Sequence, residues 1–161
     1  MDDLEEDHHR LIALFDQARC LADKGALAQA ADVFKAFAQG ARRHMWIEER
    51  WIFPCFEERT GSRTGLTATL RDEHHQLERL LDECAEALER GGADDFRERC
   101  RRLTLIVEDH AFHEEAQLYP VIEQILSPHE RDACRSRMRE DPLLPLAAPE
   151  GPDAARVPAG R

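Results

Sequence analysis

The sequence has no long apolar run, no excess of basic charge and no paired-cysteine motif. Its 161 residues carry 33 acidic against 22 basic side chains, which gives a formal net charge of -11. An acidic surface disfavours binding to nucleic acid or to an anionic membrane. Without an apolar run of about 20 residues, no segment is expected to span a bilayer.

Other absences concern the compartment and the secondary structure. The first residues, MDDLEEDHHR, lack the basic start and apolar stretch of a signal peptide. The five cysteines are scattered without C-x-x-C spacing, and such a set without a secretion signal predicts reduced thiols in the cytoplasm. Strand signals, meaning alternating β-branched runs with hairpin turns, are also missing. We therefore expect a cytoplasmic all-α protein.

The chain contains two copies of one unit. His8 aligns with His74 and His44 with His110, both 66 positions apart. Around these landmarks, DHHRLIALF aligns with EHHQLERLL, and HMWIEERWIFP aligns with HAFHEEAQLYP. Each unit therefore carries one histidine and, 36 residues later, the first residue of a His-x-x-x-Glu motif. An internal repeat of this kind indicates a duplicated structural unit.

Apolar residues recur at helical spacing in both units, as at Leu4, Leu11 and Phe15 around His8. The short connections between the helices predict an up-down-up-down four-helix bundle. A Ser127-Pro128-His129-Glu130 capping box predicts a short fifth helix that ends near Arg139. The four long helices are expected at about residues 3–23, 27–57, 67–89 and 94–126, the bundle domain at 1–140, and a disordered Pro/Ala-rich tail at 141–161.

Polar residues on the buried faces form a candidate metal site. Residues four apart share one face of a helix, so the histidine and glutamate of each His-x-x-x-Glu motif point the same way. Buried charges are costly unless something pairs with them, and a metal ion binds neutral imidazole and ionised carboxylate together. A salt-bridged bundle without metal is the alternative, but the twofold recurrence favours a dinuclear site, with iron first and manganese possible. The candidate ligands are His8, His44, Glu48, His74, His110 and Glu114.

The segments DHHRL, HMWIEERWIFP, EHHQL and HAFHEEAQLYP resemble the hemerythrin-like, HHE cation-binding family across residues 7 to 120. The resemblance implies a non-haem centre of two iron ions with a position where O2, NO or peroxide could bind. It further implies four terminal ligands, His8, His44, His74 and His110, and two bridging ligands, Glu48 and Glu114.

Two departures separate this chain from the oxygen-carrying hemerythrins. Glu78 stands where those proteins have an additional histidine ligand, and Glu115 stands at the offset of their aspartate. The symmetric set of four histidines disfavours plain oxygen carriage and is closer to the iron-centre repair proteins of the superfamily. We therefore expect a protein that binds or reacts with O2, NO or H2O2 in sensing or in oxidative or nitrosative stress. The alternative is an iron-handling or iron-sulfur-centre repair protein; the sequence assigns no catalytic residue and no protein partner.

Several neighbouring residues have open roles. His113 could be a fifth ligand, although a helix-surface histidine is favoured. Glu49 and Glu115 recur in the repeat and either orient ligand histidines or lie on a solvated face. Tyr119 could approach the metals, but its partner in the repeat is Phe53, so the fold does not require a hydroxyl there.

Overall fold

The computed structural model describes residues 2–139, which form helices joined by short turns and contain no strand. This confirms the all-α prediction, whereas the predicted tail at 141–161 lies outside the described residues. No helix in the described part has the length and apolar character needed to cross a bilayer. The helices are α1 (Asp2–Asp23), α2 (Leu27–Ile47), α3 (Phe53–Thr60), α4 (Leu66–Glu89), α5 (Ala93–His113), α6 (Tyr119–Ile125) and α7 (Pro128–Arg139), with π-helical turns η1 (Glu48–Ile52) and η2 (Glu114–Leu118).

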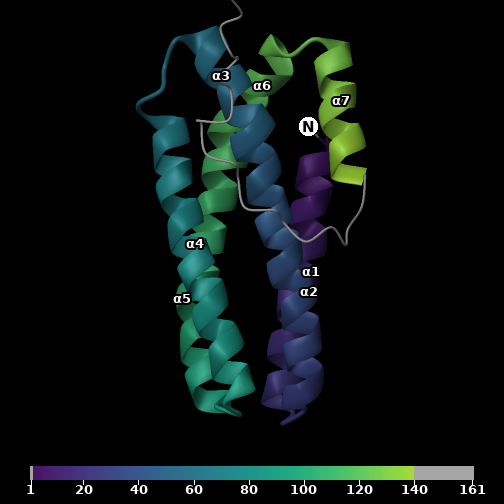
Figure 1. The fold of residues 1–161 in the computed structure, drawn as a ribbon, viewed down its shortest axis with the longest axis vertical. Coiled ribbons are helices and arrows are strands. Elements are labelled where there is room, and N and C mark those ends of the chain that lie inside the picture. The colour runs from purple at the N-terminus through teal and green to yellow at the C-terminus, as the bar shows by residue number, and fades with distance from the viewer. Residues whose placement is uncertain (1, 140–161) are drawn as a thin grey trace, which may run out of the picture.

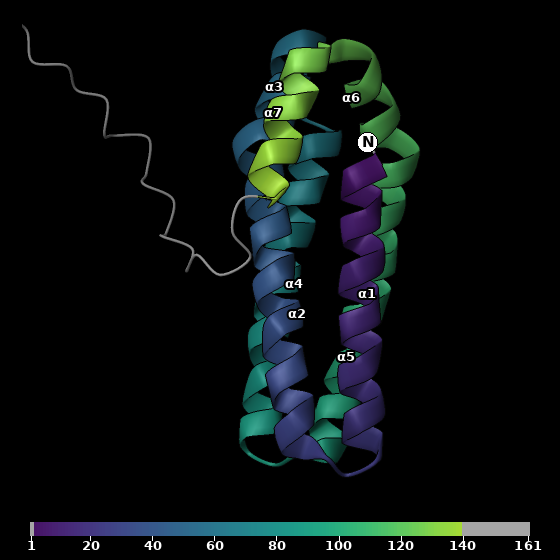
Figure 2. The same cartoon turned by 90° about the vertical axis from the view of Figure 1, so that its right-hand side faces the viewer.

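The four long helices pack side by side as an up-down-up-down bundle (Figures 1 and 2). Helix α1 packs along α2 and α4 packs along α5, while α2 contacts α4 and α1 contacts α5 to close the square. At one end, the turns within the two repeat units hold Gly25 and Gly91 at φ of 77° and 71°. Glycine populates this left-handed region readily, so both units reverse direction in the same way. The shorter helices α3, α6 and α7 gather at the opposite end.

The second and fourth predicted helices are not regular α-helices throughout, which corrects the sequence-based expectation. The backbone N–H of Phe53 bonds to the carbonyl of Glu48, and that of Tyr119 bonds to the carbonyl of Glu114, five residues back in each case. A proline follows at once in both units. In a regular helix its ring would crowd the carbonyl four residues earlier, and the wider π-turn gives it room.

The fifth helix begins with the predicted capping box. The Ser127 N–H donates to the Glu130 carboxylate at 2.8 Å, and the Glu130 N–H donates to Ser127 Oγ at 3.3 Å. Arg59 of α3 reinforces this corner by donating to Glu130 at 2.9 Å and to the Ile125 carbonyl at 2.6 Å. These contacts hold α7 against the end of the bundle.

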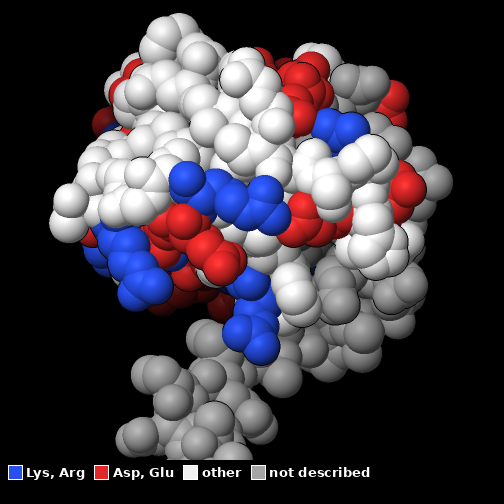
Figure 3. Space-filling model, turned by 90° about the horizontal axis from the view of Figure 1, so that it is seen from above, with Lys and Arg blue, Asp and Glu red and all other residues white. Residues whose placement is uncertain are grey.

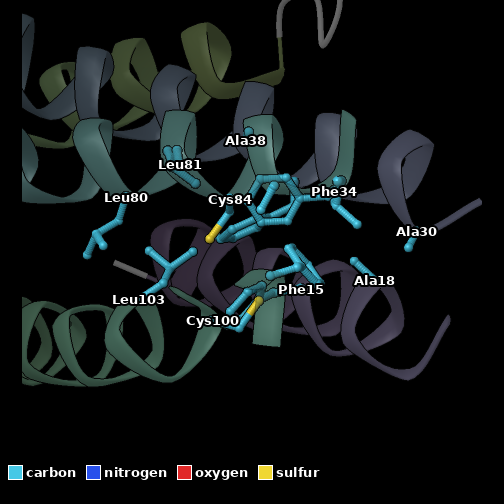
Figure 4. Close-up of a cluster of buried hydrophobic side chains, with 14 of the residues drawn as sticks. Phe15, Ala18, Ala30, Phe34, Ala38, Leu80, Leu81, Cys84, Cys100 and Leu103 are labelled. Carbon is cyan, nitrogen blue, oxygen red and sulfur yellow. The ribbon is translucent and has the colours of Figure 1, made fainter. Parts of the chain in front are cut away.

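Two apolar clusters fill the bundle and leave a polar layer between them. The turn-end cluster, built around Phe15, Phe34, Leu81 and Leu103, lies toward the short turns (Figure 4). The cap-end cluster lies toward α3, α6 and α7 and includes Leu4, Ile52, Phe53, Leu70, Leu118, Tyr119 and Ile122. Burial of each such side chain contributes about 1.5–3 kcal/mol. The clusters therefore cover the polar layer from both ends.

Candidate metal centre

All six candidate ligands predicted from the sequence meet in this polar layer. Each is buried, from 0% exposure at Glu48 and Glu114 to 8% at His8. Helix α1 supplies His8 and α4 supplies His74. Helix α2 supplies His44 and runs into η1, which begins with Glu48, while α5 supplies His110 and runs into η2, which begins with Glu114. The bundle thus brings both repeat units into one cluster, and a metal role for these side chains stays a prediction.

Each glutamate faces one histidine from either repeat unit. We call His8 and His44 the first pair, and His74 and His110 the second pair. Glu48 places Oε1 3.4 Å from Nε2 of His44 and Oε2 3.4 Å from Nε2 of His74. Glu114 places Oε2 3.0 Å from Nε2 of His8 and Oε1 3.1 Å from Nε2 of His110. Either carboxylate therefore lies between one histidine of the first pair and one histidine of the second pair.

In each of the four candidate histidines, Nδ1 contacts a carboxylate other than those of Glu48 and Glu114. Hydrogen bonds of this kind keep the proton on Nδ1 and turn Nε2 toward a metal. The Nδ1-to-oxygen contacts are His8 to Glu115 at 3.1 Å, His44 to Asp7 at 3.0 Å, His74 to Glu49 at 2.7 Å and His110 to Glu73 at 3.0 Å.

These contacts give Glu49 and Glu115 the orienting role that the sequence left open. Sequence reasoning missed Asp7 and Glu73. The signal was present, because each directly precedes an aligned histidine and the two are repeat partners, 66 positions apart.

The donor set fits a metal ion. Four ligand atoms have no hydrogen-bond partner among the described residues: Glu48 Oε2, His74 Nε2, His110 Nε2 and Glu114 Oε1. Buried polar atoms are nearly always hydrogen-bonded, and these four make the histidine-to-carboxylate contacts of 3.4 and 3.1 Å given above, which a metal ion would replace. Their residues offer donor atoms that all lie within 4.8 Å of one another, and His8, His44 and Glu114 form a second group of that kind.

The charges inside the layer support each other. Burial raises the pKa of Glu48, but the charge and hydrogen bond of His44, together with hydrogen bonds to His74 and Glu114, outweigh this and hold that pKa well below its usual range. Burial lowers the pKa of His110, yet the charge and hydrogen bond of Glu114, together with the hydrogen bond to Glu73 and the charge of Glu48, outweigh it and raise the pKa to about 10. Burial, with the nearby charges of Glu48 and Glu114, raises the pKa of Tyr119 well above its usual value. Tyr119 is therefore a neutral phenol in this site.

The π-turns bring Phe53 and Tyr119 to the site. Residues five apart share a face across a π-turn, so Phe53 and Tyr119 both face the ligand residues. The Tyr119 hydroxyl lies 3.1 Å from Glu48 Oε1 and 3.2 Å from Glu114 Oε2. Phe53 instead stacks on His74, with ring centroids 5.5 Å apart. The sequence left open whether Tyr119 approaches the metal site, and in the structure its hydroxyl does reach the ligand atoms.

Two further polar residues lie outside the cluster of ligand atoms. His113 bonds through Nδ1 to Glu73 at 2.7 Å, and its side chain is 31% exposed. It therefore shares the Glu73 carboxylate with Nδ1 of His110. Glu78, at the position of the oxygen carriers' additional histidine, is held by Arg42 at 2.8 Å. Neither residue belongs to the groups that could hold a metal ion.

A four-helix bundle with a buried layer of paired histidines and glutamates defines a class of metal-binding protein. The chain belongs to the hemerythrin HHE cation-binding domain family, whose family model matches residues 1–122. This confirms the resemblance found in the sequence. The family and the buried cluster together indicate a metal-binding protein.

One curated relative is a DNA nickase from Nostoc sp. (strain PCC 7120 / SAG 25.82 / UTEX 2576). It is 28% identical over 131 residues, a stretch that covers 81% of this chain and 35% of the relative. The chain thus spans about a third of that protein's length. No solved structure matches the chain.

Proposed function

We propose that this protein is a non-haem di-iron protein that binds a neutral diatomic molecule, O2 or NO, in sensing or in oxidative or nitrosative stress. The observation that carries the proposal is an apolar cavity directly beside the candidate ligands. The family membership supports metal binding, and the cavity supports the choice of ligand.

The donor chemistry favours iron. Imidazole nitrogen suits iron and several other transition metals, while carboxylate oxygen favours harder ions, so a mixed set fits iron first and manganese second. Structural zinc sites are usually closed and four-coordinate. Iron would supply electrons to a bound diatomic molecule. The protein would supply two carboxylate bridges and four oriented imidazoles.

The cavity has a volume of about 50 Å³ and lies between the polar layer and the turn-end cluster. Apart from His8, His44 and His110 at one end, its lining side chains are apolar, including Leu81 and Leu103. Ordered water needs several polar partners, and the mainly apolar lining offers few, so the cavity favours small apolar molecules. O2 and NO meet this condition better than peroxide, which needs several hydrogen bonds.

The burial of the site counts against iron handling, the alternative drawn from the sequence. A donor protein needs an exposed or mobile ligand, whereas the six candidates are at most 8% exposed. Apolar clusters also cover the layer from both ends. Release of iron would require the bundle to open.

DNA nicking is not proposed for this chain, despite the name of the Nostoc relative. The matched stretch is 35% of that protein, so its activity can reside elsewhere in it. The net charge of -11 also opposes contact with a phosphate backbone. On the face drawn in Figure 3, basic and acidic side chains are interspersed, without a continuous basic patch.

The test is the visible absorption spectrum of iron-loaded, anaerobically reduced protein as O2 or NO is admitted and then withdrawn. We expect a new band that follows the gas. Ala41→Leu fills the cavity from its lining and should weaken gas binding about tenfold, equivalent to about 1.4 kcal/mol. Ala28→Leu, at an exposed position on the same helix, is the control.

Gas binding unaffected by Ala41→Leu in a folded, iron-loaded protein would overturn the role of the cavity. Irreversible oxidation with loss of iron to a chelator would instead support iron handling. A band that forms only with H2O2 would make peroxide the ligand.

A further inference from the structure

The two histidine pairs differ in how their inner nitrogens are satisfied. In the first pair, Nε2 of His8 and Nε2 of His44 are hydrogen-bonded to each other at 3.0 Å. In the second pair, Nε2 of His74 and Nε2 of His110 are not hydrogen-bonded to each other, and each faces a carboxylate oxygen, at 3.4 Å on Glu48 and 3.1 Å on Glu114. A metal ion at the second pair replaces contacts between histidines and the carboxylates that would bind the same ion, whereas a metal ion at the first pair must also break a hydrogen bond between two ligand nitrogens.

The carboxylate oxygens show the same difference. Glu48 Oε2 and Glu114 Oε1 face the second pair, at 3.4 Å from His74 Nε2 and 3.1 Å from His110 Nε2, and neither accepts a hydrogen bond from the Tyr119 hydroxyl. Glu48 Oε1 and Glu114 Oε2, which face the first pair, each lie within hydrogen-bond distance of the Tyr119 hydroxyl. The difference between the two pairs therefore extends to the carboxylate oxygens that would bridge the metals.

Tyr119 is placed among the ligand atoms of the first pair. Its hydroxyl lies 3.1 Å from Glu48 Oε1, 3.2 Å from Glu114 Oε2 and 3.4 Å from His8 Nε2. Its ring also stacks on His8, with centroids 5.9 Å apart. The repeat partner, Phe53, stacks on His74 and has no hydroxyl to place among the atoms of the second pair.

We propose that the two metal positions fill in order, the position at His74 and His110 first, and that Tyr119 delays filling of the position at His8 and His44. The first metal replaces the histidine-to-carboxylate contacts of the second pair, at which neither a bond between the two histidines nor the Tyr119 hydroxyl stands in the way. The second must displace the hydrogen bond between His8 and His44 and the bonds of the Tyr119 hydroxyl. Tyr119 is thus a positioning residue that makes a symmetric ligand set unequal. This inference rests on metal binding by the six candidates and does not depend on the gas that the metals bind.

The test is anaerobic calorimetric titration of chelator-treated protein with Co²⁺ and, separately, Fe²⁺. We expect two binding events whose Kd values differ by about tenfold or more, since at least two hydrogen bonds must be given up at the second event. His44→Ala and His110→Ala, which are repeat partners, assign the events. His44→Ala should keep the tight event, and His110→Ala should lose it, with circular dichroism checking that both variants stay helical.

Two aromatic substitutions test the role of Tyr119 with little risk to the fold. Tyr119→Phe should tighten the weaker event and narrow the gap between the two. Phe53→Tyr, its repeat partner, places a hydroxyl near the second pair and should weaken the tight event. Both effects are read as Kd values and do not require activity.

Other outcomes would overturn the inference. Two equal Kd values in the unmodified protein would contradict ordered filling, as would loss of the tight event in His44→Ala. If Tyr119→Phe weakens the second event and removes a phenolate-to-iron absorption band from the ferric protein, Tyr119 is a ligand and not an obstacle. No change in either Kd would give Tyr119 no part in loading. Two bound metals without any gas-dependent spectrum would contradict the proposed function and leave the order of filling standing.

Discussion

The two repeat units carry the same ligands but surround them differently. Asp7 and Glu73 are repeat partners, and each holds the outer nitrogen of a histidine. Arg10 holds Asp7 at 2.6 Å, whereas His113 holds Glu73 at 2.7 Å. Together with the exchange of Phe53 for Tyr119, these differences show where the duplicated unit has diverged. The duplication supplies a symmetric set of donors, and the residues just outside it make the two halves unequal.

The largest effect should come from removing a carboxylate that serves both halves. Glu114 belongs to both groups of potential ligands, whereas Glu48 belongs to one. Glu114→Ala should therefore lose the metal pair and retain less metal than Glu48→Ala, which keeps His8, His44 and Glu114 together. Metal analysis after gel filtration measures the difference, and circular dichroism checks the helices.

Glu58→Ala, at an exposed position on α3, is the control and should keep the full metal content. Two metals retained by both Glu114→Ala and Glu48→Ala would show that neither carboxylate is a bridge.

A smaller effect on metal binding should follow when the carboxylate that contacts Nδ1 of a histidine is removed in one pair at a time. Glu73→Gln removes the carboxylate behind His110 and should weaken metal binding at the second pair by about 10- to 100-fold, because such outer partners orient the ligand and raise its basicity. Asp7→Asn should do the same at the first pair, through His44. Calorimetric titration separates the two Kd values.

Glu78→Gln is a matched control, because Glu78 lies on the same helix as Glu73 and is held by Arg42 away from the cluster. If Asp7→Asn and Glu73→Gln weaken the same binding event, the assignment of one carboxylate to each half is wrong.

The smallest effect concerns the pH dependence of stability in chelator-treated protein. The pKa of His110 is raised from 6.5 to about 10, so its contribution is fully present below pH 6.5 and is lost as the pH rises toward 10. The pKa values of Glu48 and Glu73 are lowered from 4.5, so their contributions are present above pH 4.5 and are lost at lower pH. Tm should therefore be highest between about pH 4.5 and 6.5 and fall by several degrees toward pH 10.

In metal-loaded protein, Tm should instead rise from pH 5 to pH 7, because the metal binds neutral imidazole and its binding releases protons. Thermal melts with and without chelator measure both dependences. A Tm that rises steadily from pH 6 to 9 in chelated protein would show that His110 is not stabilised as a cation by the carboxylates.

The duplication made the fold and the candidate ligands predictable from the sequence. A histidine such as His8 on one apolar face is weak evidence, but its recurrence at His74 with the same distance to a His-x-x-x-Glu motif is strong. The short connections then left only one simple arrangement of four helices. The capping box at Ser127 was equally predictable, because its signal is local.

The asymmetry was harder to predict because it depends on the π-turns. A regular helix of 3.6 residues per turn directs a residue five positions after Glu114 away from it, so helical spacing left open whether Tyr119 reaches the metal site. The contact between Glu73 and His113 joins two helices and cannot be derived from spacing within either one. Pro120 directly after Tyr119 hinted at a distortion, but a proline alone does not specify a π-turn.

The most direct test of the account is native mass spectrometry of chelator-treated protein titrated anaerobically with Fe²⁺. The account predicts that the chain takes up two iron ions and no more, with a one-iron species that accumulates before the two-iron species forms. Saturation at one iron, or no uptake by folded protein, would contradict a dinuclear centre built from the six buried histidines and glutamates.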